Sequence, residues 1–141
     1  MKVSAKIQYA CLAIVELGFH WPSHVPLQIA TIAGRQKIPI KFLTQIMVAL
    51  KHGGYVESMR GKSGGYVLTK APADIHLSEI VKVFGGFEGN NVAQDRFPGE
   101  KILNRFWKDV DETLIKQLER ITFEEICASV RNESGTITFV I

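Results

Sequence analysis

The sequence predicts a mostly α-helical protein with a small β wing and a long C-terminal helix. Three observations support this fold class. Apolar residues recur with helical spacing through residues 3–52, the pattern changes to alternation over residues 55–69, and a helical apolar stripe returns at residues 100–119. The chain has 141 residues, which is enough for one domain with an appendage and too few for two domains with separate cores.

The N-terminal part is expected to form three helices. The first covers residues 3–18, is apolar on two faces and therefore buried, and ends before the helix-breaking residues 20–23. The second covers residues 27–34. Pro39 is placed to begin the third, which is expected to end at Gly53-Gly54, because proline suits the first turn of a helix and glycine suits its end.

A β-hairpin is expected directly after these helices. Residues 55–59 and 66–69 are rich in β-forming side chains, and the glycine-rich segment 60–65 between them has turn composition and a basic character. The hairpin should therefore carry a long basic tip. Ser78 is expected to cap a short helix that ends before Gly85-Gly86.

The rest of the chain is expected to be a linker and a C-terminal region. Residues 85–99 have loop composition and separate a unit of residues 1–84 from residues 100–141. That last region is expected to hold a long helix, a short helix and a strand-like tail over residues 100–119, 122–130 and 136–141. The long helix needs a partner surface for an apolar stripe formed by Ile102, Leu103, Phe106, Trp107, Val110, Leu114, Ile115 and Leu118.

The net charge of +3 hides an asymmetry between the two halves of the chain. Residues 1–84 carry a net charge of +6 and residues 85–141 a net charge of −3. Within residues 27–70, seven basic side chains are accompanied by one acid, Glu57. A basic region of this kind suits a polyanionic partner, although an ordinary solvated surface would also account for it.

Composition excludes several classes of protein. Hydrophobic residues make up 46% of the chain and charged residues 22%, which is typical of a globular protein and not of a disordered one. The two cysteines, Cys11 and Cys127, are too few for a disulfide scaffold or a four-thiolate zinc site. No signal peptide or membrane span is expected, because polar residues interrupt the apolar N-terminal stretch. We therefore expect a cytoplasmic protein without a membrane partner.

Two crossing helices followed by a basic hairpin have the element order of a winged helix-turn-helix. The side chains expected to face inward and hold the two helices together are Ile32, Ala33, Ile38, Leu43 and Ile46. Lys41, Thr44, Gln45 and Val48 then face outward. Lysine can contact phosphate or guanine, glutamine can bind adenine through two hydrogen bonds, and threonine can offer a hydroxyl or pack its methyl group on thymine.

At these residues the chain resembles the Rrf2 family of bacterial transcription regulators. The resemblance rests on MKVSAKIQYA, on LQIATIAGRQKIP followed by FLTQI, and above all on SMRGKSGGYVLTKAP, so it is strong over residues 1–84 and holds only in outline afterwards. It implies a homodimer on a pseudo-palindromic operator, with the third helix in the major groove and the wing tip at the neighbouring minor groove. The candidate DNA-binding residues are Gln28, Lys37, Lys41, Phe42, Thr44, Gln45, Arg60, Gly61, Lys62 and Ser63.

Four departures from the family pattern matter. Lys37 stands where relatives usually have glycine, so the turn is expected to be reshaped or to bear a strain of about 1 kcal/mol. Phe42 replaces a tyrosine, and Thr44 replaces a glutamate, so the operator of better-known members cannot be transferred. Sensing members carry three spaced cysteines, whereas this chain has none between residues 85 and 126. We therefore expect no iron–sulfur cluster, no other cofactor and no metal site.

Other interpretations of single motifs are weaker. Gly61-Lys62-Ser63 resembles the end of a phosphate-binding loop, but Val56 stands where that motif needs glycine, so we expect these glycines to serve the turn and the approach of DNA. His20 and His24 have metal-ligand spacing but flank a proline. Cys11 and Cys127 are expected to be core residues and not redox sensors.

Two functions remain open, and neither is enzymatic, because no catalytic set of side chains is recognisable. The favoured function is a homodimeric DNA-binding regulator whose dimer interface contains Phe106, Val110 and Leu114. The same aromatic face, with Trp107, could instead line a pocket for a small-molecule effector. The alternative function is a winged-helix module for protein–protein contact without an operator of its own, in which a protein effector or partner takes the place of DNA.

Overall fold

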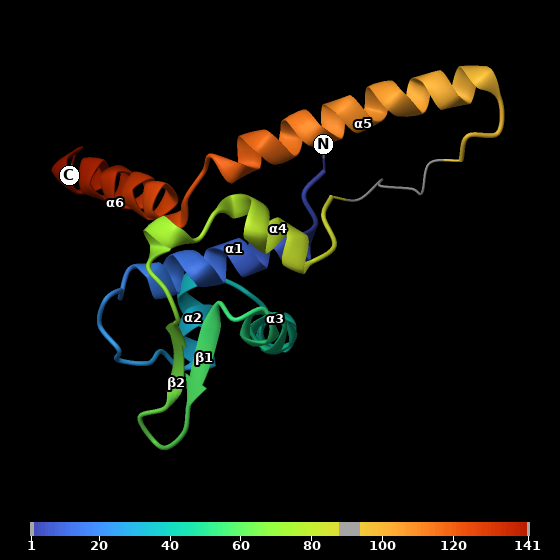
Figure 1. Ribbon diagram of the computed structural model, residues 1–141. Helices are drawn as coiled ribbons and strands as arrows, with labels where there is room; N and C mark the ends of the chain where they lie inside the picture. The colour runs from blue at the N-terminus through green and yellow to red at the C-terminus, as the bar shows by residue number, and fades with distance from the viewer. Residues whose placement is uncertain (1, 88–93, 141) are drawn as a thin grey trace.

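The computed structural model describes residues 2–87 and 94–140, with the backbone alone for residues 135–140. The described part is mostly helical with one two-stranded antiparallel sheet, as predicted (Figure 1). Its elements in chain order are α1 (Ala5–Gly18), α2 (Ile29–Gln36), α3 (Ile40–His52), β1 (Val56–Met59), β2 (Gly65–Leu68), the 3-10 helix η1 (Pro72–Asp74), α4 (Leu77–Val83), α5 (Pro98–Glu119) and α6 (Phe123–Val140).

Helix α1 is the centre of the core, and α2, α3, β2, α4 and α6 all pack against it. Its apolar side chains cover more than one face, as the sequence predicts, and Ala10, Ala13 and Ile14 are completely buried. The five side chains expected to hold the helix-turn-helix together are also buried, namely Ile32, Ala33, Ile38, Leu43 and Ile46. The crossing of α2 and α3 is therefore determined by close packing of these residues.

The wing contains a third strand-like segment that the sequence does not predict. In the hairpin, Val56 pairs with Leu68 and Met59 pairs with Gly65. Leu27, just before α2, forms an isolated bridge with Tyr66, in which the two backbones exchange hydrogen bonds of 3.0 and 2.8 Å. This bridge attaches the hairpin to the start of the helix-turn-helix, so wing and helices form one unit.

Positions 64 and 65 require glycine, because the protein's own backbone passes too close to leave room for a Cβ atom. A Cβ atom at Gly65 would overlap the Leu27 carbonyl, and one at Gly64 would overlap the Met59 carbonyl. Gly65 also has a φ of +151°, which side-chain-bearing residues rarely adopt. The close approach that these two glycines permit is therefore made within the wing and to the backbone at Leu27.

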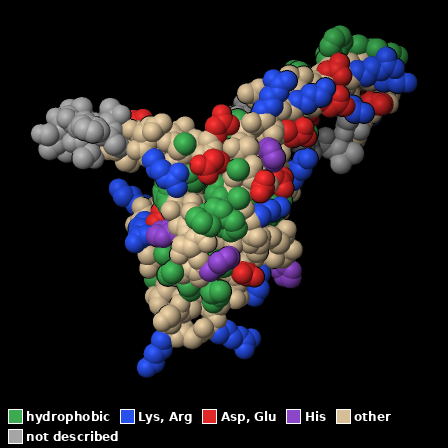
Figure 2. Space-filling model, turned by 60° about the vertical axis from the view of Figure 1, so that its left-hand side comes forward, with side chains coloured by type: hydrophobic (Ala, Val, Ile, Leu, Met, Phe, Trp, Pro, Cys, Tyr) green, Lys and Arg blue, Asp and Glu red, His purple; other side chains and the backbone are tan. Residues whose placement is uncertain are grey.

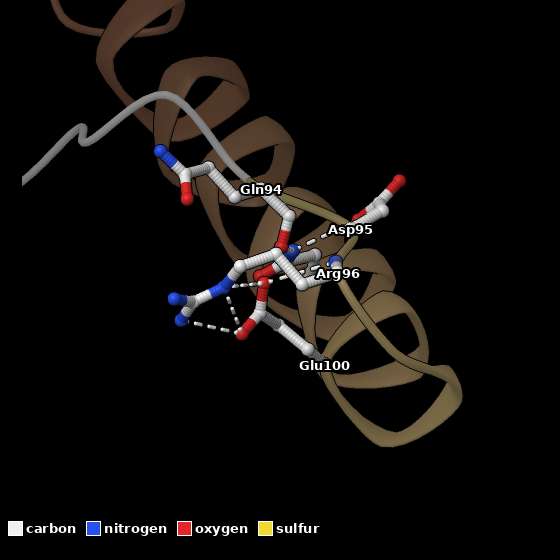
Figure 3. A network of polar contacts seen from close by, with 5 residues as sticks. Gln94, Asp95, Arg96 and Glu100 are labelled. Atoms are coloured by element: carbon white, nitrogen blue, oxygen red, sulfur yellow. Dashed lines mark hydrogen bonds and ion pairs between the residues drawn. The ribbon is translucent and has the colours of Figure 1, made fainter.

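Helix α5 projects from the domain as an arm (Figure 1). Only Leu118, near its C-terminal end, is buried, where it packs with Ile7 and Val81. Leu114 is partly buried against the same cluster. The first turns of the arm are held by a loop segment: Arg96 donates to both carboxylate oxygens of Glu100, at 3.2 and 2.9 Å (Figure 3).

The structure corrects two local expectations. The expectation of a strand-like tail over residues 136–141 is wrong, because α6 continues as a helix from Phe123 to Val140. Phe123 and Cys127 are completely buried against the core, and a helix anchored there outweighs the β preference of the residues that follow. Ser78 does not cap α4. His76 does so, in a capping box with Glu79, and Ser78 lies buried in the first turn.

The helix bounds also differ slightly from prediction. Helix α2 begins at Ile29 and not at residue 27, because the Leu27 backbone is engaged with the wing. Helix α5 begins at Pro98, ahead of the expected Glu100, with proline in its first turn, where a missing N–H costs nothing. Part of the expected linker, residues 88–93, lies outside the described residues.

Candidate nucleic-acid interface

Helix α3 presents an exposed face opposite its buried one. Leu43, Ile46, Met47 and Leu50 point into the core, and the helix therefore turns Lys41, Thr44, Gln45 and Val48 to solvent. No acidic residue occurs on α2 or α3. The four outward side chains lie at i, i+3, i+4 and i+7, so they form one continuous stripe along the helix.

Phe42 lies to one side of this stripe. Its ring packs near that of Tyr9 on α1, with 6.4 Å between the ring centroids, while 55% of the side chain stays exposed. It therefore lies at the border between α1 and α3, and not at the centre of the outward face with Lys41 and Gln45.

The wing tip places basic side chains at one end of the molecule. Arg60, Gly61, Lys62 and Ser63 are all exposed, and Gly61 adopts a φ of +109° with no atom near a substituted Cβ. Figure 2 shows Lys and Arg side chains projecting from the end of the protein formed by the wing. The tip is therefore cationic and free of bulky neighbours, as an approach to a phosphate backbone requires.

Gln28 has a structural partner that the sequence does not reveal. Its side-chain amide donates to the Lys62 carbonyl oxygen at 3.3 Å, across 34 positions of sequence. This hydrogen bond joins the N-terminal end of α2 to the wing tip. The structure thus brings Gln28 beside Lys62 and Ser63, whereas Lys37 lies at the opposite end of α2.

Glu16 is a polar residue of the helix-turn-helix that sequence reasoning missed. Its side chain is buried, and its two carboxylate oxygens accept hydrogen bonds of 3.0 Å from Arg35 and Gln36 at the end of α2. Arg35, one of the seven basic side chains within residues 27–70, is thus an ion-pair partner and also lies 3.3 Å from the His20 ring. The sequence does place this acid on the apolar face of a helix that is expected to be buried. A buried carboxylate needs a partner, so its position alone could have indicated an ion pair.

A second polar cluster joins the wing to α4. The Tyr55 hydroxyl donates to Glu79 at 3.3 Å, and Lys70 lies 3.8 Å from the same carboxylate. Burial acts to raise the pKa of Glu79, but hydrogen bonds from the His76 backbone and ring, together with the Lys70 charge, outweigh it and hold that pKa below its usual value. Glu79 therefore remains ionised at neutral pH and holds the base of the wing.

Comparison with known proteins identifies the family. The Rrf2 family, described as an iron-dependent transcriptional regulator, matches residues 3–129 of the chain. The chain belongs to the Rrf2 family. An rrf2-like HTH-type transcriptional regulator of Rhodobacter capsulatus is 41% identical over 86 residues, which cover 60% of this chain and 57% of that protein. The HTH-type transcriptional regulator IscR of Cereibacter sphaeroides is 29% identical over 94% of this chain and 89% of its own.

Solved structures of Rrf2 proteins have the same fold. IscR of T. potens matches with a TM-score of 0.76 at 29% identity, over 92% of this chain and 88% of its own. CymR of B. subtilis, the global cysteine regulator, also matches with a TM-score of 0.76, at 25% identity over 92% and 98% of the two chains. The chain is therefore a winged-helix, DNA-binding transcription regulator and not an enzyme.

The thiols of this Rrf2 protein do not fit an iron–sulfur cluster. Burial raises the pKa of the Cys11 thiol to about 12. Burial, helped by Glu124 and opposed by Arg131, also raises the pKa of the Cys127 thiol. Cys127 points at the Val15 carbonyl, 3.6 Å away. Cluster iron binds thiolates, and neither residue is an accessible thiolate at neutral pH. Residues 2–87 and 94–134 contain no grouping of three or more metal-ligating side chains.

Other features of the sequence are placed as follows. Over the part of the chain that the structure describes, no helix has the length and apolar character needed to cross a membrane. His24 packs edge-on to Trp21, with 6.1 Å between ring centroids, while His20 faces Arg35. The two histidines are therefore directed to different neighbours.

Lys37 adopts a left-handed backbone conformation, which glycine adopts without strain. Its φ and ψ are 54° and 45°, and it terminates α2 while the next amide, of Ile38, bonds to the Ala33 carbonyl at 2.9 Å. The strain of this turn therefore falls on the lysine. Lys37→Gly is expected to raise the free energy of unfolding by about 1 kcal/mol, because glycine adopts this conformation without a Cβ clash.

Chemical denaturation monitored by circular dichroism measures this effect. Lys37→Ala is the matched control, since it removes the same side chain but keeps the Cβ atom. A gain in stability as large for alanine as for glycine would contradict the backbone explanation.

Proposed function

We propose that this Rrf2 protein is a homodimer that binds a pseudo-palindromic operator, with α3 in the major groove and the wing at the adjacent minor groove. The observation that carries the proposal is the pairing of two exposed surfaces on one rigid unit: the stripe Lys41, Thr44, Gln45 and Val48, and the cationic wing tip. The Leu27–Tyr66 bridge and the Gln28–Lys62 hydrogen bond hold the two surfaces at a constant spacing. Such spacing suits simultaneous contact with neighbouring grooves.

The unpartnered face of α5 supports a dimer. The helix has 22 residues and is therefore about 33 Å long. Near its middle the helix exposes Phe106 and Trp107 at 63% each and Val110 at 57%, and Phe97 lies exposed just before it. An apolar face of this length on a small protein is typical of an oligomer interface. We propose α5 as the dimerisation arm, centred on Phe106 and Val110, with Leu114 at its inner edge.

A two-fold axis through this arm gives the operator its symmetry. In dimeric helix-turn-helix proteins the two recognition helices lie about 34 Å apart and bind half-sites one turn of duplex apart. Within each protomer, residues 1–84 together with the first turns of α6 would form the DNA-binding unit, since Phe123 and Cys127 belong to its core.

Substitution of the wing and of the recognition stripe separates their roles. Arg60→Ala is expected to weaken binding to all duplexes alike and to reduce the slope of log affinity against log salt by about 1 for each phosphate that the arginine no longer neutralises. Gln45→Ala is expected to cost about 1–3 kcal/mol at one base position in each half-site and to relax the preference there. Fluorescence anisotropy with an operator selected from genomic fragments, over a range of salt, measures both.

Lys82→Ala provides the matched charge control, because Lys82 is exposed on α4, away from the wing and α3, and pairs with Glu119 at 4.0 Å. It should leave both the affinity and the salt slope nearly unchanged. Equal losses for Arg60→Ala and Gln45→Ala on every sequence would contradict the division between wing and recognition helix.

The alternative function, a module for protein–protein contact, has one observation in its favour. Ile40, Phe42 and Val48 on α3 are each at least half exposed. If a protein docks on this surface in place of DNA, no genomic fragment will be enriched by the purified protein, and binding will not depend on Arg60 or on salt.

A further inference from the structure

We infer that the half-site read by α3 contains A·T pairs, recognised through the 5-methyl groups of thymine by Val48 and Thr44 and through adenine by Gln45. This inference rests on the proposed function and adds to it the chemical class of base sequence that the stripe can recognise. The outward side chains of α3 can offer to a base only those donors, acceptors and methyl groups that are not already engaged within the protein.

Val48 is the apolar member of the stripe. Its side chain is 50% exposed, although α3 has a complete set of buried side chains on its other face, so it is not needed for the core. In the major groove every base edge offers a hydrogen-bond donor or acceptor, and the thymine 5-methyl is the apolar group. An isopropyl group placed against any other edge would remove water from a polar group without replacing its hydrogen bond. Val48 therefore favours thymine.

Thr44 has already used its hydroxyl hydrogen. The hydroxyl donates to the Ile40 carbonyl oxygen at 2.9 Å, one turn back along α3. Thr44 consequently cannot donate a hydrogen bond to guanine O6 or N7 while this contact holds. What it presents to a base is its methyl group and an acceptor oxygen, and it lies one helical turn from Val48 on the same side of the helix. Two neighbouring methyl-bearing positions thus form an apolar edge of the stripe.

Gln45 supplies the polar readout beside that edge. Its amide forms no hydrogen bond within the described part of the protein and is exposed. A free glutamine amide matches the N6 and N7 atoms of adenine. Gln45 and Val48 are three residues apart, about 4.5 Å along the helix axis, which exceeds the rise of about 3.4 Å between neighbouring base pairs but is less than two such steps. The stripe therefore fits adjacent A·T pairs, with Lys41 in the first turn left for phosphate or guanine.

The test uses duplexes selected by the full-length protein from a randomised library. In the selected half-sites, one or more positions should contain thymine in every selected sequence. Replacing each of these thymines singly by deoxyuridine removes one methyl group and no hydrogen-bonding atom. At one position or more in each half-site the affinity should fall about fourfold, as expected for one buried methyl group.

Variants of the two residues assign the contacts. Val48→Ala should weaken binding to the thymine duplex and should abolish the difference between thymine and deoxyuridine at its position. Thr44→Val keeps a methyl group and removes the hydroxyl, so its affinity should stay within about twofold. Thr44→Ser keeps the hydroxyl and removes the methyl, so it should bind about fourfold more weakly. Both positions are exposed, and circular dichroism of each variant checks that the fold is intact.

The outcomes separate this inference from the function on which it rests. Selected half-sites that bind equally well with deoxyuridine throughout, or a Thr44→Val variant weaker than Thr44→Ser, would overturn methyl recognition while leaving the DNA-binding regulator in place. Enrichment of no duplex at all would overturn the proposed function, and the inference with it.

Discussion

Phe106→Glu is expected to convert the proposed dimer to a monomer and to reduce operator affinity by about 100-fold or more. Phe106 is 63% exposed near the middle of the unpartnered face of α5. A carboxylate there would have to be buried in an apolar interface without a partner, which is strongly unfavourable. A monomer also loses the second half-site, and linkage of two binding modules is worth about 100-fold to 10,000-fold in affinity.

Light scattering at micromolar concentration and anisotropy with a two-half-site duplex measure the two effects. Lys108→Glu is the matched control, because it adds the same carboxylate to an exposed position on the opposite side of α5. It should leave the protein dimeric. If Phe106→Glu retains the dimer mass, or if the unsubstituted protein is a monomer, α5 is not the dimerisation arm.

Gly65→Ala is expected to reduce the free energy of unfolding by about 3 kcal/mol and to loosen the wing. The added Cβ atom would overlap the Leu27 carbonyl, and a φ of +151° belongs to a region that only glycine occupies without strain. The alternative to strain is separation of β2 from Leu27, which breaks the bridge that holds the wing to the helices. Operator affinity should therefore fall further than it does for Arg60→Ala.

Thermal denaturation and hydrogen exchange of the Leu27 and Tyr66 amides measure these changes. Gly34→Ala is the control, since Gly34 lies on α2 with no atom within 4 Å of a substituted Cβ. It should be neutral or stabilising by about 0.5–1 kcal/mol, because alanine is the better helix former. Comparable losses for both substitutions would show that the cost does not come from the contact with Leu27.

The order of elements was predictable because each one carries its own local pattern. Helical spacing, the proline before α3, the Gly53-Gly54 stop and the alternation of the hairpin are properties of neighbouring residues. The same holds for the outward side chains of α3, since the buried positions Leu43 and Ile46 determine which residues face solvent. The family was predictable for a related reason: its motifs lie within single turns and strands.

The tail shows where local pattern fails. Residues 136–141 have strand-like composition, yet the helix begun at Phe123 continues through Val140. Phe123 and Cys127 dock on a core formed by α1 and η1, which lie about 50 residues or more earlier in the chain. Propensity in a short segment is weak compared with the continuation of a helix that is already anchored.

The sequence by itself thus determined the kind of protein: its helices, its basic hairpin, the outward side chains of its third helix and its family. Only the tertiary structure decided how these parts are held together, through the Leu27–Tyr66 bridge, the Gln28–Lys62 hydrogen bond and the buried Glu16 beneath Arg35. Each of these contacts joins residues 19 to 39 positions apart. Local periodicity carries no information about such pairs, because their partners meet only after the core has closed.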